Sequence, residues 1–227
     1  MSRYIALIPA AGVGARFGAG KPKQYVEIGG QTVLQHTLDI FLTSPLIDHV
    51  AVVLSPDDQV FQTASSSKLS VLRCGGETRA LTVRNGVAAL LESGLAQPND
   101  QILVHDAARC CLPVAALARL LQQAGGHAEG GILAVPVADT LKRADGGRHI
   151  AATVSRADLW QAQTPQMFRA ALLQQALSAE DLSAITDEAS AVEKLGISPL
   201  LVEGDVRNIK LTLPQDEGLV GLLLQNR

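Results

Sequence analysis

The sequence predicts an α/β protein with a Rossmann-like, mostly parallel twisted sheet, helices on both faces and a protruding β-hairpin arm. Short apolar runs alternate with segments whose apolar residues recur at helical spacing, a rhythm typical of βαβ units. Polar loops bearing glycine or aspartate follow three of these runs, and such sheets bind ligands beyond the carboxyl ends of their strands. The 227 residues, 47% of them hydrophobic, suit a single domain over residues 1–227 with a substantial core.

The elements of the first half follow in order. Residues 4–8 form an apolar run that stops at Pro9 and predicts a buried strand. Apolar residues three and four apart predict a helix over 33–41. Further strands are expected at 48–54, 70–74 and 102–104, and further helices from Gly75-Gly76-Glu77 to about 91 and over 113–123.

A strand is expected at 131–137, and the rhythm then breaks over residues 139–156. Two strand-like runs there flank Asp145-Gly146-Gly147, a strong hairpin signal. A two-stranded arm is marginally stable alone, so it packs either on a second copy of the chain or back on its own sheet, and both remain open. Beyond the arm we expect a helix entered at 165–175, a helix start at Thr186-Asp187-Glu188, a strand at 199–203 and a last helix at 215–225.

The composition excludes several classes of function. A net charge of −3 does not suit binding to nucleic acid or to an anionic membrane, so a phosphate ligand needs a local basic cluster. No apolar stretch is long enough to cross a bilayer, and the N-terminus has no charged-then-apolar signal pattern. Cys74, Cys110 and Cys111 suit neither a disulfide framework nor a metal site. We therefore expect a cytoplasmic protein with reduced thiols.

The loop after the first strand is the most informative segment of the chain. It contains Gly12 and Gly14 together with the cations Arg16, Lys21 and Lys23. Small residues let a backbone approach a ligand closely, and their N–H groups can cradle an anion to which the cations add charge. The loop is therefore a candidate triphosphate site.

Two common nucleotide fingerprints do not fit this loop. The dinucleotide fingerprint requires a third glycine at the position of Phe17. A P-loop requires serine or threonine after Gly20-Lys21, where Pro22 stands. A nicotinamide dehydrogenase and a P-loop enzyme are both disfavoured.

Taken together, the motifs of the chain resemble those of the 2-C-methyl-D-erythritol 4-phosphate cytidylyltransferases. The resemblance runs in order from about Tyr4 to Pro214, nearly the whole chain. The motifs are Pro9-Ala10-Ala11-Gly12-x-Gly14-x-Arg16, Pro22-Lys23-Gln24-Tyr25, Val104-His105-Asp106-Ala107-Ala108-Arg109, Asp139-Thr140-Leu141-Lys142, Thr164-Pro165-Gln166, Ile185-Thr186-Asp187-Glu188-Ala189-Ser190 and Asn208-Ile209-Lys210.

The resemblance implies a reaction of CTP with methylerythritol phosphate, dependent on Mg²⁺ or another divalent cation, in a homodimer built through the arm at residues 139–156. It implies a catalytic set of Arg16, Lys23 and Lys210 around the triphosphate, with Arg156 on methylerythritol phosphate. Nucleotide-binding residues would be Pro9, Ala10, Ala11, Gly12, Gly14, Gly76, Glu77 and Thr82. Substrate-binding residues would be Asp106, Arg109, Thr140, Thr164 and Thr186, some of them from the neighbouring subunit, and Asp106 would also hold the metal.

The chemistry agrees with these residue types. A phosphate monoester has its second pKa near about 6, so it is largely dianionic at neutral pH and needs no general base. Its attack on a nucleotide phosphate needs positioning and balanced charge, which arginine, lysine and one carboxylate supply.

Two alternatives remain. A related cytidylyltransferase acting on ribitol phosphate or another polyol phosphate is the nearest, although the contexts of Thr140, Arg156 and Thr186 favour methylerythritol phosphate. A silent nucleotide-sensing module would be expected to lack part of the cationic and acidic set, all of which is present.

Several nearby residues have structural explanations. His105 is interpreted as a packed, hydrogen-bonded histidine, Lys21 as a solvated loop charge, and Trp160 as a core or dimer contact. Asp187 and Glu188 are interpreted as first-turn acids that favour the dipole of the following helix.

Overall fold

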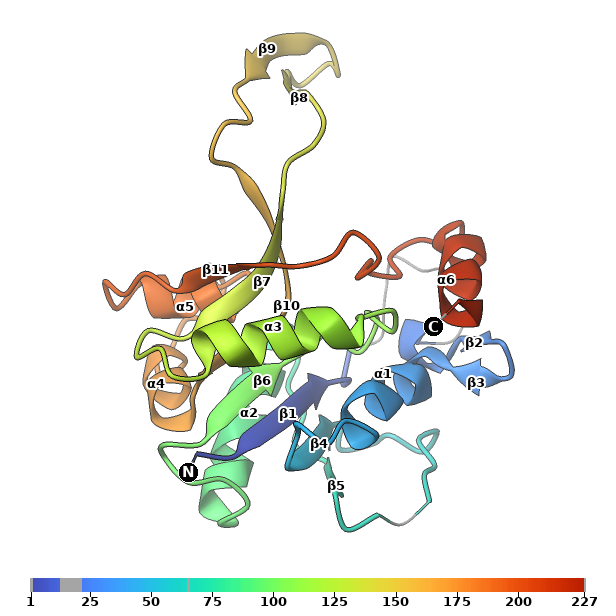
Figure 1. The fold of residues 1–227 in the computed structure, drawn as a ribbon, viewed down its shortest axis with the longest axis vertical. Helices are drawn as coiled ribbons and strands as arrows, with labels where there is room; N and C mark the ends of the chain where they lie inside the picture. Colours follow the sequence, from blue (N-terminus) through green and yellow to red (C-terminus); the bar gives the residue numbers. More distant parts are fainter. Residues whose placement is uncertain (1, 13–21, 65, 227) are drawn as a thin grey trace.

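The protein is described by a computed structural model over residues 2–12, 22–64 and 66–226. Its centre is a seven-stranded sheet with strand order β11-β7-β10-β6-β1-β4-β5 (Figure 1). Neighbouring strands are parallel except β10, which runs antiparallel to both β6 and β7. The predicted mostly parallel sheet is confirmed.

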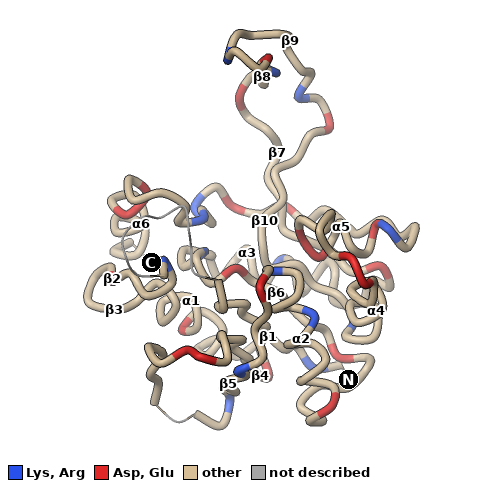
Figure 2. The backbone as a smooth tube through the Cα atoms, turned by 180° about the vertical axis from the view of Figure 1, so that it is seen from behind, with Lys and Arg blue, Asp and Glu red and all other residues tan. Residues whose placement is uncertain are grey.

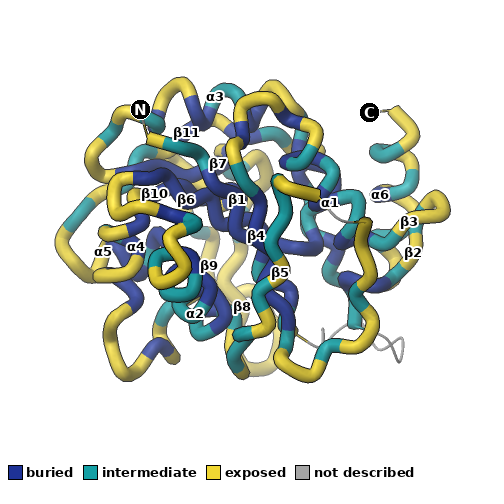
Figure 3. Tube along the Cα trace, turned by 90° about the horizontal axis from the view of Figure 1, so that it is seen from below, coloured by how far each residue is buried: buried dark blue, intermediate teal, exposed yellow. Residues whose placement is uncertain are grey.

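The seven strands of the sheet follow apolar runs of the sequence, except β10, which also carries several polar residues. They are β1 (Tyr4–Pro9), β4 (His49–Val53), β5 (Leu69–Leu72), β6 (Gln101–Val104), β7 (Gly131–Pro136), β10 (Trp160–Arg169) and β11 (Leu200–Glu203). The four interior residues of β1 are fully buried because both faces of this central strand are covered. Figure 3 shows the buried residues concentrated along these central strands.

Helices cover both faces of the sheet. They are α1 (Val33–Leu42), α2 (Arg79–Glu92), α3 (Val114–Ala124), α4 (Ala170–Ala176) and α5 (Glu188–Glu193). The last helix, α6 (Asp216–Gln225), instead packs against β2 (Glu27–Ile28). Leucines and phenylalanine of α1 and α3 join one core cluster, and the apolar residues of α2, α4 and α5 join another on the opposite face. The side chains of Thr32 and Thr78 cap α1 and α2, each accepting a backbone N–H at 3.1 Å. No helix in the described ranges combines the length and apolarity that crossing a bilayer requires.

Two local elements differ from the expectations. Residues 165–169 belong to strand β10 rather than to a helix, and the helix begins only at Ala170. Pairing of this stretch with both β6 and β7 overrides its weak local preference. A short hairpin of β2 (Glu27–Ile28) and β3 (Gln31–Thr32) was not predicted, although Gly29 and Gly30, both at positive φ, form the two-residue turn typical of such hairpins.

The predicted hairpin after β7 is a separate two-stranded sheet of β8 (Leu141–Ala144) and β9 (Ile150–Val154). It extends away from the body, so the alternative in which it folds back on the main sheet is wrong (Figure 1). Figure 2 shows acidic and basic residues spread over both the hairpin and the body. In the described chain the outer residues of the hairpin, Ile150 among them, have no part in the core.

Candidate functional site

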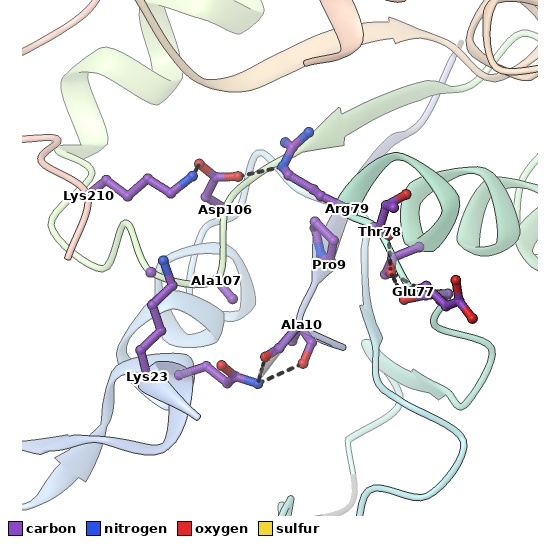
Figure 4. Close-up of a pocket in the computed structure, with 14 residues that line it drawn as sticks. Pro9, Ala10, Lys23, Glu77, Thr78, Arg79, Asp106, Ala107 and Lys210 are labelled. Carbon is purple, nitrogen blue, oxygen red and sulfur yellow. Dashed lines mark hydrogen bonds and ion pairs between the residues drawn. The ribbon is translucent and has the colours of Figure 1, made fainter. Parts of the chain in front are cut away.

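A cavity of about 270 Å³ lies at the carboxyl ends of β1 and β6. Its wall combines the start of the first loop, the turn before α2 and the segment after β6 (Figure 4). It is lined by Pro9, Ala10, Gly12, Lys23, Gln24, Gly76, Glu77, Thr78, Arg79, Thr82, Asp106, Ala107, Ala108 and Lys210. The position is the one expected for a ligand site in an open α/β sheet.

The side of the cavity near β1 is held together by Gln24. Its side-chain amide is buried and donates to the carbonyls of Ala10 and Gly12, each at 2.9 Å. Gln24 lies in the 3₁₀ helix η1 (Lys23–Tyr25), so the same turn places Lys23 at the cavity wall. The Pro-Lys-Gln-Tyr motif therefore fixes the backbone that approaches the ligand and adds a cation beside it.

The opposite side is a turn in which glycine is required by close packing. A Cβ on Gly75 would contact Ala11 Cβ and lie 2.7 Å from the carbonyl oxygen of Leu54. The buried hydroxyl of Thr82 accepts the N–H of Gly76 at 3.1 Å and lies 2.9 Å from the carbonyl of Thr78. Thr82 thus holds the turn that presents Gly76 and Glu77 to the cavity.

The most strongly charged part of the site surrounds Asp106, whose carboxylate is nearly buried. Arg79 Nε lies 2.8 Å from its Oδ1, and Lys210 Nζ lies 2.8 Å from its Oδ2. Arg109 Nε is 3.5 Å from the same Oδ2. The other two nitrogens of Arg79 contact both oxygens of Glu188, at 2.7 and 3.0 Å. Of the residues that the structure describes, three cations and two acids therefore meet at the end of β6, with a net charge of about +1 when all are ionised.

These contacts determine which groups are charged. Burial alone would raise the pKa of Asp106, but Arg79, Lys210 and Arg109 outweigh it and hold that pKa well below its usual range. Burial would lower the pKa of Arg79, but Glu188 and Asp106 raise it. For Arg109 burial prevails and lowers the pKa, with Asp106 opposing the shift. Both shifts favour the ionised forms, so Asp106 is an anion and Arg79 a cation at neutral pH.

A second cavity, of about 210 Å³, adjoins the first. Arg79, Asp106 and Lys210 line both cavities, so the charged cluster stands between them. The other residues of the second cavity are Arg109, Ala162, Gln163, Thr164, Gln166, Thr186 and Asp187. Two ligands bound in these cavities would meet beside the same cations.

A buried hydrogen-bond chain supports this junction from beneath. His105 is fully buried, which lowers its pKa to about 4, so the ring is neutral. Its Nε2 lies 2.9 Å from the carbonyl of Arg109 and must donate, which makes Nδ1 the acceptor of the Thr164 hydroxyl at 3.0 Å. The Thr164 oxygen in turn accepts the N–H of Asp106 at 3.1 Å. The interpretation of His105 as a packed, hydrogen-bonded histidine is confirmed.

A sequence profile of the family described as 2-C-methyl-D-erythritol 4-phosphate cytidylyltransferase matches residues 4–226. The chain belongs to this family. The member from Neisseria meningitidis serogroup C is 67% identical over 224 residues, which cover 98% of this chain and 97% of the relative.

Solved structures of cytidylyltransferases agree with the assignment. A crystal structure of 4-diphosphocytidyl-2C-methyl-D-erythritol synthase is 59% identical, covers 99% of each chain and has a TM-score of 0.87. The 2-C-methyl-D-erythritol 4-phosphate cytidylyltransferase of Francisella tularensis is 34% identical with a TM-score of 0.83, over 98% of this chain and 100% of that one. The resemblance drawn from the motifs is confirmed, and so is the expectation of an enzyme of the nucleotidyltransferase class.

Most predicted site residues of this cytidylyltransferase lie together. The first cavity gathers Pro9, Ala10, Gly12, Lys23, Gly76, Glu77, Thr82, Asp106 and Lys210. The second gathers Asp106, Arg109, Thr164, Thr186 and Lys210. Their individual roles stay predictions.

The remaining predicted residues lie elsewhere. Ala11 packs toward Gly75 and is not among the lining residues of either cavity. Thr140 and Arg156, at the two roots of the hairpin, line neither cavity of their own chain. Gly14 and Arg16 lie outside the described residues, as does Lys21.

Sequence reasoning missed Arg79 and gave Glu188 an incomplete role. Glu188 does occupy the first turn of α5, but its buried carboxylate also contacts Arg79. Arg79 is the first residue of α2, where a cation opposes the helix dipole. That mismatch, a cation at a helix start beside a glycine turn, was the available signal that Arg79 has carboxylate partners.

Proposed function

We propose that this chain transfers the cytidylyl group of CTP to 2-C-methyl-D-erythritol 4-phosphate, giving 4-diphosphocytidyl-2-C-methyl-D-erythritol and pyrophosphate in isoprenoid precursor synthesis. The observation that carries the proposal is the junction of two cavities at Asp106, Arg79 and Lys210. CTP would occupy the first cavity, beside Lys23 and the Gly76 turn. The sugar phosphate would occupy the second, beside Arg109 and Thr186.

The reaction needs no base at this junction. The phosphate monoester of the acceptor is largely dianionic at neutral pH, and its oxygen attacks the α-phosphorus of CTP in line with the leaving pyrophosphate. Two anions must be brought together while charge builds on the α-phosphate oxygens. Lys210 lines both cavities and is half-exposed, so it is suited to contact both reactants. Lys23, on the nucleotide side, would contact the triphosphate.

The hydrogen bonds of Thr164 suit a positioning role better than the direct substrate contact expected of it. Its hydroxyl proton is directed at His105 and its oxygen accepts the Asp106 N–H. We propose that Thr164 holds the segment of Asp106 and Arg109 in place, and that contact with the acceptor comes from Arg109 and Thr186.

We propose Asp106 as the protein ligand of a divalent cation, Mg²⁺ by preference. The described residues contain no group of three histidines, cysteines or acids that would form a metal site by itself. One carboxylate fits an ion that arrives with the triphosphate, because Mg²⁺ keeps several waters and commonly takes one or two carboxylates plus substrate phosphates. When bound, the ion would neutralise charge on the phosphates.

We propose that the active form is a homodimer in which the arm at residues 139–156 completes the partner's site. Thr140 and Arg156 line neither cavity of their own chain, and Ile150 on the hairpin is 68% exposed. A contribution across a dimer interface would explain both facts. Sedimentation at micromolar concentration tests this: a dimer is expected, and a monomer alone contradicts it.

A cytoplasmic location completes the proposal. The proposed substrate CTP is a cytoplasmic nucleotide, which supports this location. Fractionation of cells that express the full chain tests the location, with release into the cytoplasmic fraction as the expected result.

The decisive experiment measures pyrophosphate release with four nucleoside triphosphates and a panel of polyol phosphates, with and without Mg²⁺. Release only with CTP, methylerythritol phosphate and metal is the expected outcome. Release with ribitol phosphate in place of methylerythritol phosphate overturns the choice of acceptor. No release with any pair overturns the reaction itself.

A further inference from the structure

Glu188 is a buried acid that lines neither cavity but contacts a residue that lines both. Its side chain is 1% exposed, and its two oxygens are both occupied by Arg79, at 2.7 and 3.0 Å. The third nitrogen of Arg79, Nε, donates to Asp106 Oδ1 at 2.8 Å. The guanidinium is therefore held between the start of α5 and the end of β6.

We propose that Glu188 and Arg79 are a positioning pair for Asp106, in which Glu188 limits how Arg79 engages that carboxylate. Arginine prefers to bind a carboxylate with two parallel N–H donors. Glu188 accepts that paired contact, so Arg79 offers Asp106 a single donor on Oδ1. Oδ2 is left facing Lys210 and Arg109, on the side where the two cavities meet.

Without the negative charge of Glu188 the balance at the junction changes. Three cations would then compete for one carboxylate, and Arg79 would be free to turn its paired donors onto both oxygens of Asp106. Asp106 would become less available to a divalent cation, and Lys210 would lose its closest partner. Glu188 acts on the reaction through Arg79, although it touches no substrate.

The locations of the two residues also argue against a purely structural pair. Arg79 begins α2, where its charge is unfavourable for the helix, and it lines both cavities. A pair selected only for stability has no reason to place its cation there.

The chain offers a matched control at the other end of β6. Asp100 is also nearly buried and is paired with an arginine, Arg3, with Nη2 2.9 Å from Oδ2. It lines neither cavity. Asp100→Asn thus removes a comparable buried charge without touching the site.

The test compares Glu188→Gln, Glu188→Asp and Asp100→Asn with wild type. The test rests on the proposed reaction, so activity is measured with CTP, methylerythritol phosphate and Mg²⁺. Binding of Mn²⁺ in the presence of CTP is measured separately, by electron paramagnetic resonance. We expect Glu188→Gln to lower kcat and weaken Mn²⁺ binding by about 10- to 100-fold, the range for partners that orient a metal ligand. Glu188→Asp, which keeps the charge, recovers part of both losses, and Asp100→Asn changes neither by more than about twofold.

The outcomes separate the two proposals. If wild type fails to release pyrophosphate, the proposed reaction fails, whereas the Mn²⁺ measurement still tests the pair. If wild type is active and Glu188→Gln matches it in kcat and Mn²⁺ affinity, the positioning pair is wrong. If Glu188→Gln lowers the melting temperature, as Asp100→Asn does, but leaves kcat and Mn²⁺ affinity unchanged, the pair is structural and the proposal is overturned. Should Glu188→Gln not fold, Arg79→Lys, which cannot bridge two carboxylates as a fork, carries the same expectations.

Discussion

The two ends of strand β6 each carry a buried aspartate paired with an arginine, yet the two are built differently. Asp100 precedes the strand and accepts the backbone N–H groups of Arg3 at 3.0 Å and Gln97 at 2.8 Å in addition to the Arg3 guanidinium. Asp106 follows the strand, and the described contacts to its carboxylate come from side chains alone. The carboxylate of Asp100 therefore holds a turn of the backbone, whereas the carboxylate of Asp106 binds several cationic side chains.

The difference separates a structural charge from a functional one. At Asp100 one acid meets one base, and backbone donors fix the geometry. Among the described residues at Asp106 the cations outnumber the acids, and the ammonium of the partly exposed Lys210 is held there by an ion pair. A surplus of positive charge at a cavity is unfavourable until an anion binds there, so the surplus itself indicates a phosphate ligand.

The largest expected difference between the two ends is in catalysis. Asp106→Asn should lower kcat/KM by about 100- to 1,000-fold, the scale for losing one preorganised electrostatic group, because it removes the proposed metal ligand and the anchor of Lys210. Asp100→Asn should change kcat/KM by no more than about twofold. Steady-state pyrophosphate release measures both, and similar losses in the two variants would remove the distinction.

Lys210 tests whether the cations at Asp106 act on the reactants. Lys210→Gln should lower kcat by about 100-fold, since its charge is placed between the two cavities. Lys210→Arg keeps the charge and should recover part of the loss, although arginine does not reproduce a compact ammonium. Circular dichroism serves as the control for folding. A kcat for Lys210→Gln within about threefold of wild type contradicts the proposed role.

His105 tests the support beneath the functional end. Burial lowers its pKa to about 4, below the value of about 6.5 expected in the unfolded chain. The unfolded state therefore takes up a proton first, and stability falls as pH drops from about 6.5 to about 4, by up to about 3 kcal/mol. Imidazole resonances measured by NMR should show His105 neutral, with the proton on Nε2, at pH 5.5. Titration of His105 near its ordinary pKa would contradict the hydrogen-bond chain.

The sheet was largely predictable because buried strands are continuous apolar runs. Such runs mark β1, β4, β6 and β7 directly. Strand β10 was partly misread as a helix because its centre carries glutamines and Pro165, and only pairing with β6 and β7 makes it a strand. That pairing is non-local, and local patterns do not record it.

The site was predictable to the extent that it is carried by loops after strands. The segments around Ala10, Gly76 and Asp106 were singled out because parallel strands bring their carboxyl ends together. The contact of Arg79 with Glu188 joins residues 109 positions apart and was not foreseen. The first-turn position of Glu188 accounts for an acid at that place by itself, so the local sequence carries no sign of a second partner. The contact forms only because the fold brings the start of α5 to the start of α2.

The smallest expected effect is the stability change at the structural end. Asp100→Asn should lower the free energy of unfolding by about 1 to 2 kcal/mol, less than for a fully buried pair because the Arg3 side chain is 43% exposed. Burial would raise the pKa of Asp100, but the N–H groups of Arg3 and Gln97 and the Arg3 charge outweigh it and lower that pKa. The stabilisation is therefore present above the unfolded pKa of about 3.9 and is lost as pH falls through the lower folded value.

Urea unfolding at neutral pH and near pH 3.5 measures this dependence. The difference in free energy of unfolding between wild type and Asp100→Asn should have its full value at neutral pH and be smaller near pH 3.5. If this difference instead grew in acid, the ionised carboxylate of Asp100 would be destabilising, and the interpretation of Asp100 and Arg3 as a stabilising pair would be wrong. If Asp100→Asn also lowered turnover under conditions in which the variant remains folded, the two ends of β6 would be coupled through the strand. Asp100 would then no longer serve as a purely structural reference for Asp106.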